Sequence, residues 1–306
     1  MTSILAPGDL KDLKEKSVLI TGGASGLGLE TALLFASNGA YVTVADVQPP
    51  LEVLAKPGHH VQYVKCDVSD WKSQVAAFKA AIEFSPTRSL DVVATFAAVD
   101  LLENLIDEIK AVEDVSLDTD PAPPSLRTID INLKGSYYSA ALSLHYFRLQ
   151  APGMPSASPA PKALIFVSSL AGYLDDDHNI AYTTSKFGTR GLFRALRRRT
   201  AKELSPGVRV NLIAPWAVKT PMTEPLLKLM EGMGIQEGKG ITFATTKTCA
   251  EAVGRCAVDE TIHGRAFAIM PEGAFDLKDD IEGGYGGEEL KILMSWRKAA
   301  GDFLQG

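Results

Sequence analysis

The stretch Ser17-Val-Leu-Ile-Thr-Gly-Gly-Ala-Ser-Gly-Leu-Gly28 decides the fold of this chain. It begins as a short β-branched run that predicts a buried strand. It then passes through a glycine-rich turn into residues 26–37, where apolar side chains recur at helical spacing. Glycines between a strand and a helix let a phosphate group approach the backbone N–H groups at the helix N-terminus. The stretch therefore predicts a phosphate-binding turn at the start of an α/β fold.

Further β-branched runs follow along the chain, and longer stretches with helical spacing lie between them. The predicted strands are residues 17–21, 41–46, 61–66, 91–95, 163–169, 208–213 and 265–270. The helical stretches include residues 26–37, 70–84, 126–150 and 180–204. This alternation is typical of βαβ units, in which helices cover both faces of a parallel sheet. We predict a doubly wound, Rossmann-type α/β fold with a seven-stranded parallel sheet.

The composition of the 306-residue chain agrees with one domain. Apolar residues make up 46% of it, which is enough for a large core. No internal repeat or sharp change of composition marks a domain border, so we expect one domain over residues 1–306. Within it we expect a C-terminal tail from about residue 273 and a flap at about 220–246, where glycines follow a short apolar helix candidate; an ordinary long loop is the alternative.

Several classes of partner are disfavoured. The net charge of −6 gives no general attraction to nucleic acid or to anionic membranes. No stretch reaches the ~18 apolar residues of a membrane span, and the first residues lack the pattern of a secretory signal. We therefore expect a cytoplasmic protein with a small-molecule partner. Three cysteines, Cys66, Cys249 and Cys256, form no metal-binding or disulfide pattern, so we expect buried thiols and no metal.

The glycine-rich turn and the ends of the next two strands predict a dinucleotide site. Asp46 ends the second predicted strand, at about the 20-residue offset where an acid binds the ribose hydroxyls of adenosine. A carboxylate there repels a 2′-phosphate, and residues 22–54 contain no lysine or arginine, so NAD is favoured over NADP. An exposed strand-end aspartate is the alternative. From the turn, the expected binding residues are Gly22, Ser25, Gly26, Leu27 and Gly28.

Two residues after the third predicted strand, Asp67 and Val68, lie where they would flank an adenine ring. Helix capping by Asp67 or Ser69 explains the same residues equally well.

Tyr182-Thr-Thr-Ser-Lys186 opens the predicted helix 180–204 and sets a phenol and an ammonium group one turn apart on the same face. The ordinary pKa of a phenol is about 10, and a fixed cation beside it lowers that pKa. The pair is therefore suited to proton transfer. Ser169 ends the fifth predicted strand, where its hydroxyl would hydrogen-bond a substrate oxygen beside the phenol.

From about residue 15 to residue 272 the chain resembles the short-chain dehydrogenase/reductase family. The resemblance rests on Thr21-Gly-x-x-x-Gly-x-Gly28, Asp67, Asn132 in Ile129-Asp-Ile-Asn-Leu-Lys-Gly, Ser169, Tyr182-x-x-x-Lys186, and residues 215–220. It implies that Tyr182 is the acid/base and that Ser169 holds the substrate oxygen. It also implies that Lys186 binds the nicotinamide ribose and tunes Tyr182, and that Asn132 supports a water relay to Lys186. By the same resemblance, Val218 and Thr220 hold the nicotinamide amide.

The resemblance also implies a homodimer or homotetramer, paired through the helices equivalent to 126–150 and 180–204. In its details, such as the predicted last strand at 265–270, the chain is more similar to one subgroup. That subgroup contains 15-hydroxyprostaglandin dehydrogenase-like enzymes and fungal secondary-metabolite alcohol dehydrogenases.

Two places depart from the family pattern. The family's Asn-Asn-Ala-Gly after the fourth strand is Thr95-Phe96-Ala97-Ala98 here, which puts the approach of the nicotinamide in question. Trp216 replaces a glycine beside the expected nicotinamide pocket, where we expect the indole to reshape the substrate cleft; a core aromatic that faces away is the alternative. With Leu170 and Tyr173 as further apolar candidates for the cleft, a lipophilic or aromatic substrate is expected.

The sequence therefore predicts an NAD-dependent oxidoreductase that interconverts a secondary alcohol and a ketone. Because cellular NAD is mostly oxidised, alcohol oxidation is the favoured direction. The alternative is a cofactor-binding homologue without net redox turnover, such as a cyclase, an isomerase or a regulatory protein. An interaction module built on the proline-rich residues 151–162 and the acidic residues 276–289 has no coherent pattern behind it; residues 151–162 fit a surface spacer better.

Overall fold

The structure is a computed structural model that describes residues 5, 8–49, 52–54, 56–113, 115–149, 162–174, 179–204, 207–232, 236–237 and 240–279. The predicted spacer lies outside these residues except for Lys162, and so does the predicted tail beyond residue 279. The predicted flap is described in part.

The described strands form an eight-stranded sheet in the order β10-β9-β6-β5-β4-β1-β2-β3. Its strands are β1 (Ser17–Thr21), β2 (Tyr41–Asp46), β3 (His60–Lys65), β4 (Val92–Thr95), β5 (Lys162–Val167), β6 (Val208–Pro215), β9 (Ala266–Met270) and β10 (Gly273–Asp276). All seven predicted strands are present and pair in parallel. The doubly wound α/β fold is confirmed.

The predicted number of strands was one too low. After β9 the chain turns back over Pro271 and Glu272, and β10 pairs antiparallel with β9 at the edge of the sheet. The sequence analysis assigned these residues to a tail, because four residues at an edge carry too weak an apolar pattern to be read as a strand.

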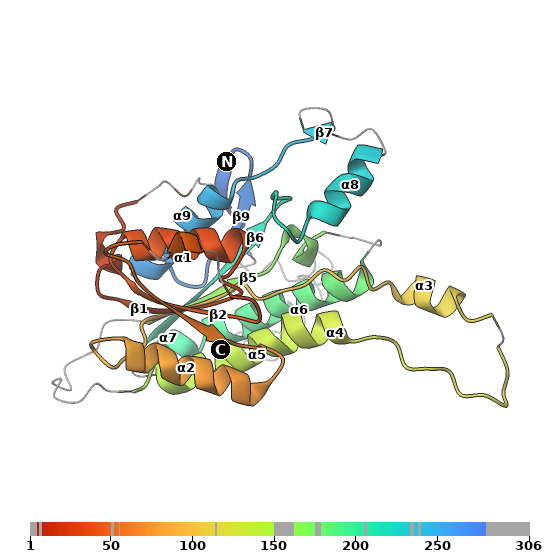
Figure 1. Ribbon diagram of the computed structural model, residues 1–306, viewed down its shortest axis with the longest axis horizontal. Coiled ribbons are helices and arrows are strands. Elements are labelled where there is room, and N and C mark those ends of the chain that lie inside the picture. Colours follow the sequence, from red (N-terminus) through yellow and green to blue (C-terminus); the bar gives the residue numbers. More distant parts are fainter. Residues whose placement is uncertain are drawn as a thin grey trace, which may run out of the picture.

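Helices cover both faces of the sheet (Figure 1). On one face lie α1 (Gly26–Ser37) and α9 (Thr246–Val258), which pack on alternate strand residues such as Ile20 and Val44. On the other face lie α2 (Trp71–Phe84), α5 (Gly135–Tyr146) and α6 (Ile180–Arg197), which pack on Leu19 and Ala45. Because successive strand side chains point to opposite faces, each strand contributes to both cores.

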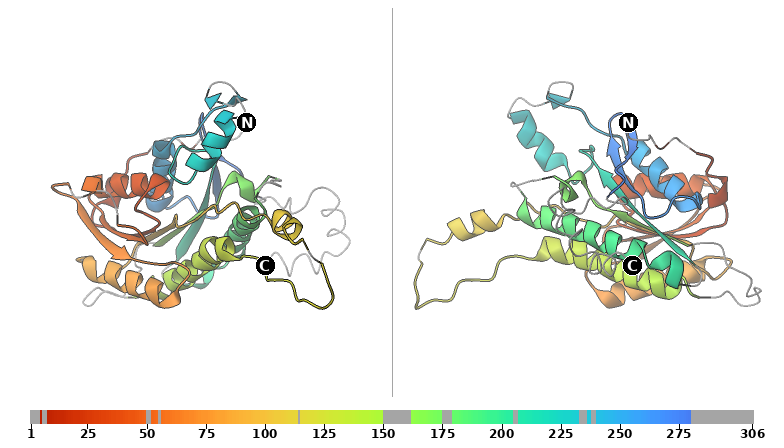
Figure 2. Two further views of the ribbon diagram at one scale, coloured as in Figure 1. Left: turned by 45° about the vertical axis from the view of Figure 1, so that its right-hand side comes forward. Right: turned by 180° about the vertical axis from the view of Figure 1, so that it is seen from behind.

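The shorter elements belong to the connections. They are α3 (Leu105–Lys110), α4 (Arg127–Ile129), a π-helical turn (Asp130–Lys134), α7 (Thr200–Glu203), α8 (Glu224–Gly232), the two-residue strands β7 (Gln236–Glu237) and β8 (Gly240–Ile241), and 3-10 turns at Lys11–Leu13, Glu52–Leu54 and Leu170–Gly172. The part of the chain that carries α3 projects from the body of the molecule (Figure 2). Among the described helices, none is long and apolar enough to cross a membrane.

The three cysteines are buried, as predicted. Cys249 and Cys256 lie on the sheet side of α9, where burial raises the pKa of each thiol to about 12. Cys66 follows β3, and burial raises the pKa of its thiol to about 11.

Candidate active site

The carboxyl ends of the parallel strands meet at one edge of the sheet, where the connecting segments enclose a cleft of about 340 Å³. Ligands of doubly wound folds bind at this edge. The lining brings together most of the residues that the sequence indicated: Gly22, Ser25, Gly26, Leu27, Gly28, Asp46, Asp67, Val68, Ser169, Tyr182, Lys186, Trp216, Val218 and Thr220. Among the described residues, Asn132, Leu170 and Tyr173 are not part of this lining.

The turn after β1 leaves no room for side chains at two of its glycines. A Cβ on Gly28 would lie 2.2 Å from the carbonyl oxygen of Gly22, and a Cβ on Gly22 would lie 2.5 Å from the backbone nitrogen of Ala97. Gly22 also has a φ of +70°, which favours glycine. Ser25, at the N-cap of α1, makes no side-chain capping bond, and it lines the cleft together with the first residues of the helix, Gly26 to Gly28. This cradle fits the diphosphate of a dinucleotide.

Asp46 is fixed at the rim of the cleft. One oxygen of its carboxylate accepts a hydrogen bond from Ala24 N at 3.0 Å, and the other accepts from Gln48 N at 3.1 Å. The carboxylate therefore links the end of β2 to the glycine-rich turn. It is held where the adenosine ribose of a bound dinucleotide is expected.

Asp67 and Val68 lie further along the same side of the cleft. Asp67 accepts hydrogen bonds from the backbone and the hydroxyl of Ser69. The N-cap of α2 is Asp70, which accepts from Ser73 N, so neither Asp67 nor Ser69 caps that helix. The capping alternative is thereby removed for both residues.

Tyr182 and Lys186 lie in the first two turns of α6. The Nζ atom of Lys186 is 5.2 Å from the centre of the Tyr182 ring and donates to the carbonyl oxygen of Val167 at 3.3 Å. Burial lowers the pKa of Lys186 to about 8, against the opposing effect of Asp100. A lysine in this state is still a cation at neutral pH, but it gives up its proton far more easily than an exposed lysine.

Ser169 lies beside this pair at the end of β5. Its hydroxyl oxygen accepts a hydrogen bond from Ala171 N at 3.1 Å as the N-cap of the following 3-10 turn. Its own hydrogen has only a long contact of 3.5 Å, to the carbonyl of Pro215. The hydroxyl thus remains available to a ligand oxygen in the cleft.

Asn132 lies behind the cleft, in the π-helical turn between α4 and α5. Its amide accepts from Val99 N at 2.8 Å and donates to Val99 O at 2.9 Å and to the Ser185 hydroxyl at 3.1 Å. It therefore ties the segment after β4 to α6. A role in a water relay stays a prediction.

The altered segment after β4 keeps its place through backbone contacts. Phe96 N donates to Thr21 O at 2.9 Å, and the Phe96 ring packs in the core on the α1 side while it also lines the cleft. Ala97 and Ala98 line the cleft as well. In this structure the segment is thus held by a backbone hydrogen bond and by the packing of Phe96.

Trp216 lines the cleft and is 36% exposed, so it does not face away into the core. Its indole Nε1 donates to the carbonyl oxygen of Thr242 at 3.1 Å, and its backbone N donates to Ile269 O at 2.9 Å. The ring is therefore oriented by a contact with the far end of the predicted flap. The two ends of the flap also meet in a bridge between Val218 and Ala244.

Leu170 and Tyr173, predicted for the substrate cleft, lie elsewhere. Leu170 packs against the core on the face of the sheet that α2, α5 and α6 cover. The Tyr173 ring lies under the guanidinium of Arg190, 4.0 Å from its centre, and burial raises the pKa of its phenol well above the usual range. Their sequence position, directly after Ser169, gave no information on which way the side chains turn.

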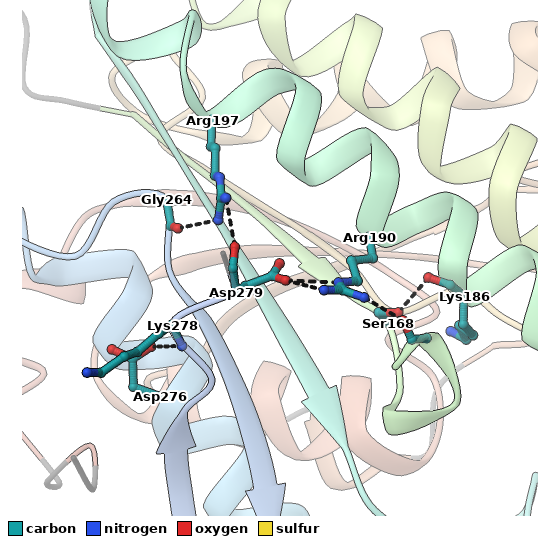
Figure 3. Close-up of polar contacts among 9 residues, drawn as sticks. Ser168, Lys186, Arg190, Arg197, Gly264, Asp276, Lys278 and Asp279 are labelled. Atoms are coloured by element: carbon teal, nitrogen blue, oxygen red, sulfur yellow. Dashed lines mark hydrogen bonds and ion pairs between the residues drawn. The ribbon is translucent and has the colours of Figure 1, made fainter. Parts of the chain in front are cut away.

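Behind α6, a buried ion pair fastens the helix to the end of the described chain (Figure 3). Arg190 donates to the Asp279 carboxylate through Nε at 2.9 Å and through Nη2 at 2.6 Å. Arg197 donates to the backbone oxygens of Asp279 and Gly264. On the side toward the cleft, the Ser168 hydroxyl donates to Lys186 O at 2.9 Å.

Sequence reasoning missed several lining residues. They are Val47, Cys66, Val99, Arg127, Ile131, Val167, Ser168, Pro221, Met222 and Thr223. Most are neighbours of predicted positions. Extending the predicted site by one residue at each strand end would have included some of them. Arg127 precedes Asn132 by somewhat more than one helical turn and carries no local signal of its own.

The comparisons with known proteins agree on one family. The family model "short chain dehydrogenase" matches residues 16–230. A 5′-hydroxyaverantin dehydrogenase of Dothistroma septosporum is 46% identical over 300 residues, which cover 96% of each chain. One from Emericella nidulans is 47% identical over 298 residues, again with 96% of each chain.

A more distant relative, named an NADP-dependent dehydrogenase, comes from Cochliobolus lunatus. It is 38% identical over 208 residues, which cover 66% of this chain and 71% of the relative. Among solved structures, a 3-hydroxyacyl-CoA dehydrogenase type-2 from Mycobacterium avium superposes with a TM-score of 0.64 at 25% identity, covering 86% of this chain and 98% of the other.

Proposed function

Because the chain belongs to the short-chain dehydrogenase family, we propose that it is an NAD-dependent dehydrogenase that oxidises a secondary alcohol to a ketone, with Tyr182 as the acid/base. One observation carries the proposal. A phenol, a buried ammonium group and a hydroxyl, from Tyr182, Lys186 and Ser169, line the same cleft as a glycine cradle that fits a diphosphate.

In the proposed reaction, Ser169 donates a hydrogen bond to the substrate oxygen and orients the carbinol. Tyr182 removes the hydroxyl proton as the C–H bond breaks. The bound nicotinamide supplies the hydride acceptor. Lys186 favours the phenolate form of Tyr182 through its charge, and its pKa of about 8 lets its own proton exchange near neutral pH.

Asp46 supports NAD as the cofactor. Its carboxylate is fixed by two backbone N–H groups at the rim of the cleft, where it would accept hydrogen bonds from ribose hydroxyls and repel a 2′-phosphate. Some relatives are named NADP-dependent, so both cofactors belong in the test.

For the substrate, we propose 5′-hydroxyaverantin or an alcohol of the same kind, because two relatives that match 96% of the chain at 46% and 47% identity bear that name. The partly exposed indole of Trp216 on the cleft wall supports an aromatic partner, since flat rings stack favourably on an indole face.

The test is a turnover assay with purified protein, 5′-hydroxyaverantin, and NAD or NADP in parallel, followed by the absorbance of the reduced nicotinamide. We expect NAD-linked turnover. We expect Tyr182→Phe to lose at least about a hundred-fold in kcat, because the general base is gone, while NADH binding measured by fluorescence stays intact.

Undiminished turnover in Tyr182→Phe would remove Tyr182 from the mechanism. If NADH binds but no alcohol in a broad panel of aromatic and aliphatic secondary alcohols is oxidised, and no ketone is reduced, the cyclase, isomerase or regulatory alternative is favoured instead.

A further inference from the structure

The segment that follows β4 is fastened next to the catalytic helix. Val99 is held by Asn132 through both of its backbone groups. Glu103 accepts a hydrogen bond from Ala181 N through its backbone oxygen at 3.3 Å and from Thr128 N through its carboxylate at 3.1 Å. Residues 99–103 are thus anchored at both ends, and one charged side chain lies between them.

That side chain is Asp100, which binds the start of α6. Its Oδ1 accepts from the Asn179 side-chain amide, in a short hydrogen bond, and from Leu102 N at 3.2 Å. Asn179 is buried and is the N-cap of α6; its own oxygen accepts from Tyr182 N at 3.1 Å. The Asn179 amide therefore connects a carboxylate directly to the backbone of the catalytic tyrosine.

Asp100 is also the charged residue that acts on Lys186. The ammonium group donates to the Val167 carbonyl on β5 and lies 5.2 Å from the centre of the Tyr182 ring on α6, whose phenol is itself titratable. Ser168 and Asn132, on the neighbouring elements, are neutral. Arg190, one turn further along α6, has its charge paired with Asp279. Burial of Lys186 disfavours its cation, and Asp100 opposes that effect.

We propose that Asp100 is a positioning residue of the site, which holds the first turn of α6, and with it the backbone of Tyr182, through Asn179 and places a negative charge behind the pair of Tyr182 and Lys186. The inference rests on the proposed function, because the Lys186 cation matters through Tyr182. Asp100 itself does not line the cleft. It acts on Tyr182 and Lys186 from outside the cleft.

The primary test is the titration of Lys186 in the protein without cofactor or substrate. Lysine labelled with carbon-13 at Cε reports the ionisation of each side chain by NMR, and the Lys186 signal is the one missing from Lys186→Met. In Asp100→Asn, which keeps the shape and removes the charge, we expect Lys186 to lose its proton about one pH unit lower than in the wild type. Asp107→Asn, an exposed acid on α3, is the matched control and should leave the titration unchanged.

The second readout is the pH profile of kcat/KM with cofactor and substrate. Removal of the Asp100 charge should move the alkaline limb of this profile to lower pH. At pH 8, lowering the pKa of Lys186 by one unit reduces the protonated fraction of Lys186 about five-fold. Asp100→Glu keeps the charge and should restore most of the profile. A purely structural role would lower kcat/KM at every pH and leave the limb in place.

An unchanged Lys186 titration in Asp100→Asn overturns the proposal, whatever happens to activity. Asp100→Ser provides a second neutral variant if the asparagine variant does not fold. Since the titration needs no turnover, a shifted titration in an enzyme that oxidises no alcohol would support the role of Asp100 and count against the proposed function alone.

Discussion

Some residues of the site can be predicted from their neighbours in the sequence, and others cannot. Gly22, Gly28, Tyr182 and Lys186 follow rules of spacing: a glycine where a side chain would collide, and a phenol and a cation one helical turn apart. Such rules operate on neighbours in the chain, so the sequence predicted these positions. Asp100 contacts Asn179 across 79 positions, and its surroundings in the sequence contain no sign of that contact.

Asp46 allows a direct test of the cofactor choice at this scale. In Asp46→Ala we expect the KM for NAD to rise roughly ten-fold, because hydrogen bonds to a charged acceptor contribute about 1.5–3 kcal/mol each and the ribose partner is lost. NADP should be affected less, because the repulsion of its 2′-phosphate disappears at the same time. The measurement is the ratio of kcat/KM for the two cofactors.

Glu52→Ala is the control for that experiment, since it removes the same charge from an exposed side chain on the turn after β2. If the ratio of kcat/KM for NAD to that for NADP is the same in Asp46→Ala as in the wild type, Asp46 does not bind the ribose. The hydrogen bond from Ala24 N would then be its main role.

Secondary-structure elements were predicted well where the pattern was long and the burial complete. The helix expected at 26–37 has those bounds, and the strands buried on both faces appear as continuous apolar runs. α9 went unpredicted, although its buried residues, such as Ala250, Val253 and Ala257, share one face of the helix. The side-chain directions after Ser169 depend on how the 3-10 turn packs against α6, which is a tertiary effect.

At the scale of elements, Trp216 joins the end of β6 to the far end of the flap. Trp216→Phe keeps an aromatic ring but removes the donor to Thr242 O. We expect the KM for the alcohol to rise about two- to ten-fold, in line with the loss of one hydrogen bond of about 0.5–1.5 kcal/mol. NADH binding, measured by fluorescence, should not change.

Trp71→Phe is the matched control, because Trp71 is exposed on α2 and does not line the cleft. If Trp216→Phe weakens NADH binding and leaves the KM for the alcohol as it was, the indole supports the cofactor site and the flap contact is incidental.

The segment that projects beside α6 exposes several large apolar side chains. Leu105, Ile106 and Ile109 on α3 are each more than two-fifths exposed, at 44%, 52% and 60%. Exposed apolar groups of this kind mark contact surfaces. No sequence rule predicted the projection, because charged and apolar residues alternate there without a clear period.

This surface is a second candidate contact for the predicted oligomer, because the sequence analysis expected pairing through the helices at 126–150 and 180–204 and not through α3. We expect light scattering to give a mass of at least twice the 32.8 kDa of one chain. Ile109→Asp should lower that mass, while Val53→Asp, at an exposed apolar residue of the 3-10 turn Glu52–Leu54, should not. A mass of one chain for the wild type at micromolar concentration would contradict the prediction.

The position of the three thiols has a practical consequence for following this protein in solution. Cys66 lines the cleft but is itself buried, so its alkylation requires a local opening that a bound dinucleotide should make rarer. Cys249 and Cys256 lie between α9 and the sheet and react only after the helix has separated from it. Alkylation of the native chain, resolved by peptide, therefore reports occupancy of the site at one cysteine and opening of the core at the other two.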